Sequence, residues 1–395
     1  MPEILILGAG KIGRGFIAHL AHRSGWKVSF SDASQALVAG LTQARRYRID
    51  IAGRPEATEY IPVHEACALS DAPTLQALVA RCDLLACAVG APNLPALAQA
   101  LAPALAARRE RGPLDWLILE NADKPAETIR KALLASAPAH AAGWITSQLG
   151  LVETQVLRSG MPPEPSLAKS EPLAVRMHDW WTLPADRDAF RGPIPGITGL
   201  VPRGNFEHEL TRKIYTFNGL NGPISYLGWI NGYRLMHEAA CAVELQGVLE
   251  QIHRESAHGL IGEFGFEPQE HAAFQAIAWH KYRDPALQDA IERNARDSAR
   301  KLSIRERLVG PAMLCLKHGR QPTAYASAIA AAIHYTGSDD PGTASVAQCL
   351  AAGGVPLVLE RICALPAGSA LAPLIIAADA RRAYLHGRSA GGISP

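Results

Sequence analysis

Residues 3–16 read EILILGAGKIGRGF, and they carry the strongest structural signal in the chain. The apolar run at 4–7 predicts a short buried strand. Gly8, Gly10 and Gly13 follow with the spacing G-x-G-x-x-G, and an apolar pattern of helical period begins at once. In such a turn the first glycine makes the bend, the second lets the backbone approach a pyrophosphate, and the third lets the helix pack on the strand. The stretch therefore predicts a dinucleotide-binding βα unit.

The start of this helix and the end of the next strand add to the prediction. Backbone N–H groups near Lys11 and Ile12 lie where a helix N-terminus attracts phosphate. The run WKVSFSD at 26–32 predicts a second strand, and its last residue, Asp32, comes 24 residues after Gly8. A carboxylate there bonds a ribose 2′-OH and repels a 2′-phosphate, which predicts NAD rather than NADP. The alternative is a glycine turn in an unrelated α/β protein.

Two further apolar runs, DLLACAVG at 83–90 and DWLILEN at 115–121, are typical of buried parallel strands. The carboxyl ends of such strands face a cofactor crevice, so we expect Val89, Gly90 and Asn121 to contact the cofactor. Asn121 has another interpretation, as a loop amide that caps the next helix.

The composition changes twice along the chain. Prolines and glycines cluster over 160–204, which indicates either a linker or a small sheet extension of the first domain. Helical patterns then dominate. We therefore predict an α/β Rossmann-type N-terminal domain at 1–204, an all-α C-terminal domain at 205–395, and a site between them.

Composition narrows the class of protein. The chain has 395 residues, 48% hydrophobic and 19% charged, with a formal net charge of +2. These values fit two globular domains and give no reason to expect nucleic acid or a membrane as partner. No apolar run looks long enough to span a bilayer, and no leader is expected. The seven scattered cysteines suggest reduced thiols and a cytoplasmic location. His253 and His258 lack metal-ligand spacing, so no metal site is expected.

Residues 213–223, KIYTFNGLNGP, place Lys213, Asn218 and Asn221 in a mostly apolar stretch. A lysine that loses hydration has a lowered pKa and can act as a general base. Amides can donate to a developing alkoxide without a change of charge. The alternative is a solvated lysine on a helix that the asparagines cap and that Gly222-Pro223 stops.

A group of cations in ERNARDSARKL predicts an anion-binding face. Arg293, Arg296 and Arg300 recur at helical spacing, and Lys301 follows. Such a face suits a phosphate or carboxylate. The alternative is a surface helix balanced by neighbouring acids.

Over nearly its whole length the chain resembles the polyol-specific long-chain dehydrogenases, that is, the mannitol dehydrogenase family, and in particular the mannitol-1-phosphate dehydrogenases among them. The shared motifs are LGAGKIGRGF at 7–16, AVG at 88–90, EN at 120–121, GLVETQVLR at 150–158, RKIYTFNGLN at 212–221, the run at 283–308, and AIAAAIHYTGSDDP at 328–341. The resemblance implies a metal-independent NAD enzyme. It places the catalytic lysine on Lys213 and the supporting asparagines on Asn121 and Asn218, and it adds Arg158 and Lys301 to the substrate side.

The chain departs from the family pattern at three positions. Asn221 stands where the family has histidine, Leu157 where it has aspartate, and Asp284 where it has asparagine. A lost buried carboxylate changes which hydroxyls a site can read, because an unpaired polar group costs about 1–3 kcal/mol.

The sequence thus predicts NAD-dependent oxidation of an acyclic polyol phosphate to a sugar phosphate by a monomer or small homo-oligomer. Two alternatives stay open. One is a dehydrogenase or reductase of an unphosphorylated polyol or of a sugar acid such as a hexuronate; the other is a non-redox enzyme with tightly bound NAD.

Overall fold

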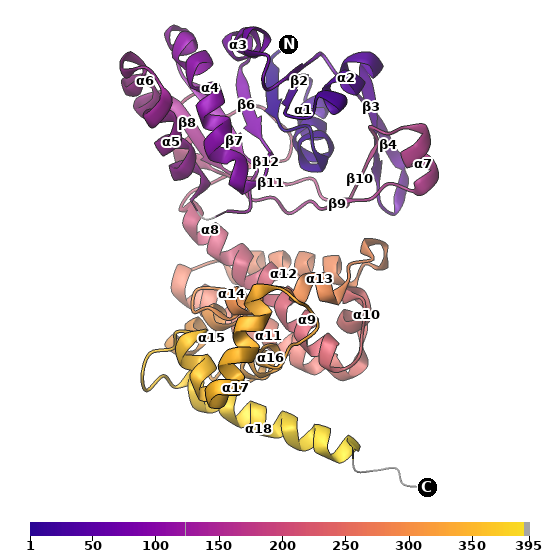
Figure 1. Cartoon of the computed structure of the whole chain (residues 1–395), viewed down its shortest axis with the longest axis vertical. Helices are drawn as coiled ribbons and strands as arrows, with labels where there is room; N and C mark the ends of the chain where they lie inside the picture. The colour runs from indigo at the N-terminus through magenta and orange to yellow at the C-terminus, as the bar shows by residue number, and fades with distance from the viewer. Residues whose placement is uncertain (123, 391–395) are drawn as a thin grey trace. The chain divides into compact units, whose positions relative to one another are not determined.

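The computed structural model describes residues 1–122 and 124–390, and the chain forms two compact units. The first runs from Met1 to Phe206 and the second begins at Glu207. Each unit is described by itself (Figure 1).

The first unit is built on a parallel sheet with the order β5-β2-β1-β6-β7-β8. The chain starts in the middle at β1, moves to one edge, returns to the middle at β6 and continues to the other edge, as in doubly wound dinucleotide-binding folds. The four strands predicted for this sheet are confirmed as β1 Glu3–Leu7, β2 Lys27–Asp32, β6 Leu84–Cys87 and β7 Leu114–Ile118. The sheet has two further strands, β5 Glu65–Ala68 and β8 Leu149–Glu153.

Alternation along β1 divides the core into two layers. Leu5 and Leu7 face a cluster formed with α3 to α6, whereas Ile4 and Ile6 face a cluster that includes α1 and the second sheet. A strand buried on both faces must be apolar throughout, which explains the unbroken run. The helices are α1 Ala18–Arg23, α2 Gln35–Ala44, α3 Ala72–Arg81, α4 Leu94–Arg108, α5 Pro125–Ser136, α6 Ala142–Ser147 and α7 Pro165–Ser170.

The proline- and glycine-rich stretch at 160–204 is a sheet extension, so the linker alternative is wrong. It contributes two strands to a second sheet of order β4-β3-β10-β9 and forms a small parallel pair, β11-β12. The bounds are β3 Arg46–Ile51, β4 Arg54–Pro62, β9 Gly160–Met161, β10 Val175–Met177, β11 Leu183–Asp186 and β12 Leu200–Arg203.

The second unit is helical, as predicted. In its core α9 packs against α10, α11, α13 and α16. The bounds are α8 Phe206–Lys213, α9 Gly219–Ile230, α10 Met236–Cys241, α11 Val243–Phe264, α12 Pro268–Arg283, α13 Ile291–Ala295, α14 Ser298–Leu302, α15 Val309–Lys317, α16 Thr323–Ile333, α17 Pro341–Arg361 and α18 Leu371–Ala390.

The helix does not stop at Gly222-Pro223, so that part of the alternative interpretation is wrong. A π turn at Ile214–Asn218 joins α8 to α9, and Pro223 lies inside α9. Proline cannot donate to the carbonyl four residues earlier, which belongs to Gly219. The hydroxyl of Tyr325 donates to that carbonyl instead, at 3.2 Å. The helical run therefore continues because a side chain from α16 satisfies the freed carbonyl.

The predicted single helix through the arginine-rich run is also wrong. α13 and α14 are separate, and Asp297 between them has a φ of 60°. Asp340, which caps α17, accepts a hydrogen bond from the backbone N–H of Asp297 at 3.0 Å. This contact holds the break, so Arg293 and Arg300 do not share one helix face.

The expectation that no apolar stretch is long enough to span a bilayer is wrong, because α17 is long and apolar enough by length and composition alone. A core helix of a soluble protein passes the same test. The helix is also kinked, because Gly353 and Gly354 have non-helical backbone angles.

Candidate active site

The glycine loop after β1 has the geometry that its spacing predicts. Gly8 has a φ of 92°, and a Cβ there would lie 2.5 Å from the carbonyl oxygen of Ala88. A Cβ at Gly13 would lie 2.0 Å from the carbonyl oxygen of Gly8, so the turn and the close packing are confirmed. At Gly10 a Cβ would meet nothing within 4 Å. The protein itself therefore leaves the space at Gly10 that an approaching pyrophosphate requires.

Asp32, the last residue of β2, is tied to this loop. Its Oδ2 accepts from the N–H of Ala9 at 2.7 Å, and its Oδ1 accepts from the N–H of Ser34 at 2.8 Å. Both carboxylate oxygens are thus oriented by backbone groups, and each retains a lone pair for a ribose hydroxyl.

The helix beside Gly13 begins with a π turn, Gly13–Ile17, before α1.

Glu120, which follows β7, binds the loop after β6 that was predicted to contact the cofactor. Its Oε1 accepts from the N–H of Val89 at 2.7 Å and from that of Gly90 at 2.9 Å. Burial raises the pKa of Glu120, whereas these two hydrogen bonds lower it. Asn121 is exposed and follows directly after. Sequence reasoning missed Glu120, although its place at a strand end beside Asn121 was the available signal.

Lys213, the last residue of α8, is half-buried in the second unit. Burial lowers the pKa of its amine to about 8, and the positive charges of Lys281 and Arg307 act in the same direction. Glu306 opposes them. An amine with this pKa is present in both protonation states near neutral pH, as a general acid–base group requires.

The π turn after Lys213 affects which side chains share its face. The hydrogen bond of a π turn joins residues five apart, and here the N–H of Gly219 donates to the carbonyl of Ile214. Residues five apart are therefore more nearly aligned than in an α-helix, and Lys213 and Asn218 are such a pair. Turns of this kind are frequent at functional sites.

Asn221, at the family's histidine position, is 7% exposed. Its Nδ2 donates to Oδ1 of Asn294 at 2.9 Å, and the carbonyl of Asn294 accepts from Nζ of Lys301 at 2.5 Å. The three residues therefore form a hydrogen-bonded chain from α9 through α13 to α14. Because an amide does not titrate near neutral pH, Asn221 can orient neighbours but cannot carry a proton.

Two of the predicted substrate cations, Arg293 and Arg300, are paired with carboxylates. Arg293 has a side chain that is 75% exposed and pairs with Asp289 at 3.1 Å. Arg300 pairs with Asp297 at 2.6 Å and with Glu306 at 2.8 Å.

Lys301 is buried, unlike these two arginines. It also donates to the carbonyl of Arg296, and burial lowers its pKa to about 7.

Arg158 lies inside the first unit. Its side chain is 2% exposed, its Nε donates to the carbonyl of His178 at 3.0 Å, and its guanidinium stacks 4.5 Å from the ring centre of Trp181. The neighbouring Leu157, at the family's aspartate position, is also buried. A role for Arg158 as a substrate ligand stays a prediction.

Two cations near Lys213 were not singled out from the sequence. Lys281 lies on α12, and burial lowers its pKa to about 8. Arg307 follows α14 in the chain, and its side chain is 12% exposed. Only the tertiary structure brings them to Lys213, so no local pattern in the sequence could have identified them.

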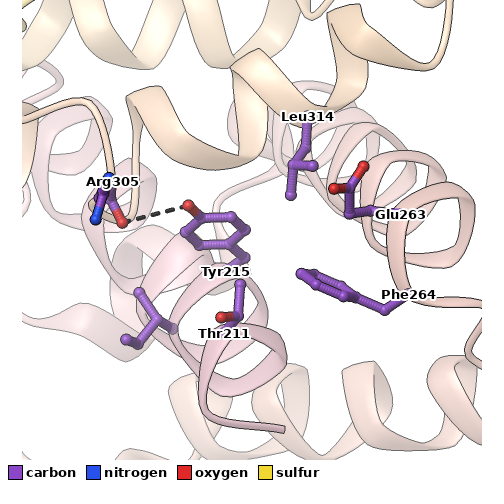
Figure 2. A pocket seen from close by; sticks show the side chains of 7 residues that line it. Thr211, Tyr215, Glu263, Phe264, Arg305 and Leu314 are labelled. Atoms are coloured by element: carbon purple, nitrogen blue, oxygen red, sulfur yellow. Dashed lines mark hydrogen bonds between the residues drawn. The ribbon is translucent and has the colours of Figure 1, made fainter. Parts of the chain in front are cut away.

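A separate pocket of about 340 Å³ lies in the second unit (Figure 2). The hydroxyl of Tyr215 donates to the carbonyl of Arg305 at its edge, at 3.3 Å. None of the predicted catalytic side chains lines it; the lining residues are Thr211, Ile214, Tyr215, Glu263, Phe264, Arg305 and Leu314. Among the side chains that the structure describes, no cluster of three or more potential metal ligands is present.

Two family models match consecutive parts of the chain: the mannitol dehydrogenase Rossmann domain over residues 2–198 and the mannitol dehydrogenase C-terminal domain over residues 206–350. The chain belongs to the mannitol dehydrogenase family. It is therefore an NAD-dependent oxidoreductase of the polyol dehydrogenase class. The predicted family, fold class and cofactor are confirmed.

Solved structures show the same fold at low sequence identity. The Pseudomonas fluorescens mannitol 2-dehydrogenase ternary complex with NAD and D-mannitol is 16% identical, with a TM-score of 0.69 over 96% of this chain and 90% of that chain. A D-sorbitol dehydrogenase in substrate-free form is 15% identical, with a TM-score of 0.79 over 96% of this chain and 92% of that chain.

Proposed function

We propose that this mannitol dehydrogenase family member oxidises an acyclic polyol phosphate to a sugar phosphate, with Lys213 as the general base. The observation that carries the proposal is the environment of Lys213, where burial and two neighbouring cations lower the pKa of the amine to about 8. The neutral amine can take the proton of the reacting hydroxyl. NAD, when bound, accepts the hydride.

The remaining residues have supporting roles in this proposal. Asn218 holds the substrate oxygen, and its amide donor stabilises the developing alkoxide. The family resemblance assigns the same kind of donor to Asn121. Asp32 and the glycine loop would hold the adenosine ribose and the pyrophosphate. Lys213 takes the proton directly, so the proposal needs no metal-bound water.

The phosphate is supported by the positive charges around Lys213. Lys281 and Arg307 are half-buried, and both lower the pKa of the Lys213 amine, whereas Glu306 is the carboxylate that opposes them. An anionic substrate group would offset this repulsion.

We further propose a cytoplasmic location, which the seven free cysteines support.

A second candidate is an unphosphorylated polyol. The two structural neighbours are named for mannitol and sorbitol, which carry no phosphate. A sugar acid such as a hexuronate would bring a carboxylate to the same cations.

Absorbance of NADH at 340 nm can separate these substrates. The purified full chain is assayed against matched pairs of free and phosphorylated hexitols, and in reverse against ketoses, ketose phosphates and hexuronates. We expect the highest kcat/KM for a phosphorylated hexitol. A free hexitol or a hexuronate with a higher value would replace the phosphate assignment, and no turnover with any of them would overturn the redox function.

A further inference from the structure

Arg307 is placed against the start of α9, beside the residues assigned to catalysis. Its Cδ lies 3.6 Å from where a Cβ of Gly222 would be, and Leu308 lies at 3.1 Å from the same point. A Cβ at position 222 would be in ordinary contact with Arg307 and in tight contact with Leu308. The stem of Arg307 therefore packs against the helix directly after Asn221.

The guanidinium of Arg307 is held at one edge only. Its Nε donates to Oε2 of Glu306 at 3.0 Å, and the same carboxylate accepts from Nη1 of Arg300 at 2.8 Å. Within the part of the chain that the structure describes, no hydrogen bond to either Nη atom of Arg307 is present. The side chain is thus oriented by Glu306, while its two-pronged end remains available to a ligand.

The charges around this end do not balance. Lys213 and Lys301 both experience the positive charge of Arg307, and Lys281 adds its own charge at Lys213. Glu306 is the carboxylate that faces Arg307, and Arg300 shares it. The other carboxylates that act on these cations also bind other groups. Asp289 acts on Lys281 and pairs with Arg293, and Asp297 acts on Lys301 and pairs with Arg300. Asp340 acts on Lys301 and accepts from Ser338, Thr343 and the backbone of Asp297.

We infer that Arg307, assisted by Lys281, forms a subsite that binds the anionic group of the substrate, a phosphate or a carboxylate, beside Lys213. A guanidinium presents two parallel donors that match two oxygens of such a group. Arg293 and Arg300, which the sequence favoured, are more exposed and already paired with carboxylates. This inference rests on the proposed function, because it places the substrate by the position of Lys213.

Binding of inorganic phosphate to the protein with saturating NAD, measured by calorimetry at constant ionic strength, tests the subsite. NAD fills the pyrophosphate site, so the probe reports on the second unit. We expect Arg307→Ala to weaken phosphate binding roughly 10- to 100-fold, the loss expected of a charge-assisted pair. The same titration with acetate shows which anionic group the subsite prefers. Whichever of the two anions binds the unmutated protein more tightly should lose affinity in Arg307→Ala.

Arg305→Ala is the matched control. Arg305 lies two residues before Arg307, carries the same charge and is exposed. It should leave phosphate binding unchanged. Equal losses of affinity in both variants would show that phosphate binding depends only on the net charge of the protein, and this would overturn the subsite. Arg307→Lys keeps the charge without the planar fork, so we expect it to recover part of the binding. Full binding in Arg307→Ala would also overturn the inference.

Kinetics separate this inference from the proposed function. Arg307→Ala should raise KM for a phosphorylated hexitol far more than KM for the matching free hexitol or for NAD. If neither hexitol is oxidised but phosphate still requires Arg307, the redox assignment fails and the subsite stands. If hexitols are oxidised through Lys213 and the variant has unchanged KM values, the subsite fails and the dehydrogenase stands.

Discussion

The carboxylate of Asp32 accepts a hydrogen bond from the backbone N–H of Ala9 at 2.7 Å, which joins the end of β2 to the glycine loop after β1. The same side chain also accepts from the N–H of Ser34. Asp32 therefore shapes the loop in addition to presenting a negative charge. A change at this position affects both the choice of cofactor and the geometry of its site.

We predict that Asp32→Ala reduces the preference for NAD over NADP and weakens the binding of both. The first effect follows from lost repulsion of a 2′-phosphate, and the second from two backbone N–H groups that lose their acceptor. Fluorescence titration with NADH and NADPH measures both effects. Better binding of NADP than of NAD by the unmutated protein would contradict the role of Asp32.

Gly10 and Gly13 should respond differently to alanine. Gly13→Ala places a Cβ 2.0 Å from a backbone oxygen, so we expect loss of stability of the first unit. Gly10→Ala meets nothing within 4 Å, so thermal unfolding should change little while NAD affinity falls. Unaltered NAD affinity in Gly10→Ala would show that the pyrophosphate lies elsewhere.

Lys213 should determine the pH dependence of the reaction. The neutral amine is the base, so alcohol oxidation should rise with pH through about 8, whereas ketone reduction needs the protonated amine and should fall. Lys213→Ala should lower kcat by about 10²- to 10⁴-fold, with NAD affinity near normal. Lys317→Ala, on an exposed lysine, is the control. An unchanged pH profile in Lys213→Ala would remove the residue from the mechanism.

Asn221 and Asn294 should act as a pair. Their hydrogen bond links α9 to α13, so single alanine variants should be non-additive in a double-mutant cycle, with a coupling of about 0.5–1.5 kcal/mol. Asn221→His introduces a titratable ring at the family's histidine position, and we expect a second ionisation in the pH profile or a changed substrate preference. Wild-type behaviour in both respects would place Asn221 outside the site.

Tyr325→Phe should destabilise the second unit. The change leaves the carbonyl of Gly219 without the donor that Pro223 cannot supply, at a cost of about 1–3 kcal/mol in the free energy of unfolding. Urea unfolding followed by circular dichroism measures this. Tyr233→Phe removes an exposed hydroxyl that bonds Glu244 and should cost less than about 0.5 kcal/mol. Equal effects would show that the buried hydroxyl has no special role.

The first unit was readable from the sequence because its signals are local. The apolar run before Gly8, the glycine spacing and the acid at Asp32 each lie within a few residues of the structure that they determine. The parallel arrangement of the sheet then follows from the alternation of strands and helices. The catalytic candidates Lys213 and Asn218 were also within reach, through a short stretch that resembles the family.

Tertiary structure decided what local pattern could not. The sequence NGP allowed either a helix end or a continued helix, and the hydroxyl of Tyr325, from a distant helix, selects the second by satisfying a carbonyl that proline leaves unpaired. The backbone of Asp297 is turned by the carboxylate of Asp340, which breaks the predicted arginine helix.

That break changes which cations can matter. Arg293 and Arg300 form ion pairs with different carboxylates, whereas folding brings Arg307 and Lys281 close to Lys213. Residue type and spacing predicted the fold and the cofactor, and the family resemblance pointed to the lysine. The charge environment of that lysine depends on contacts between residues far apart in the chain, because burial and long-range pairing, not sequence order, set the cost of each charge.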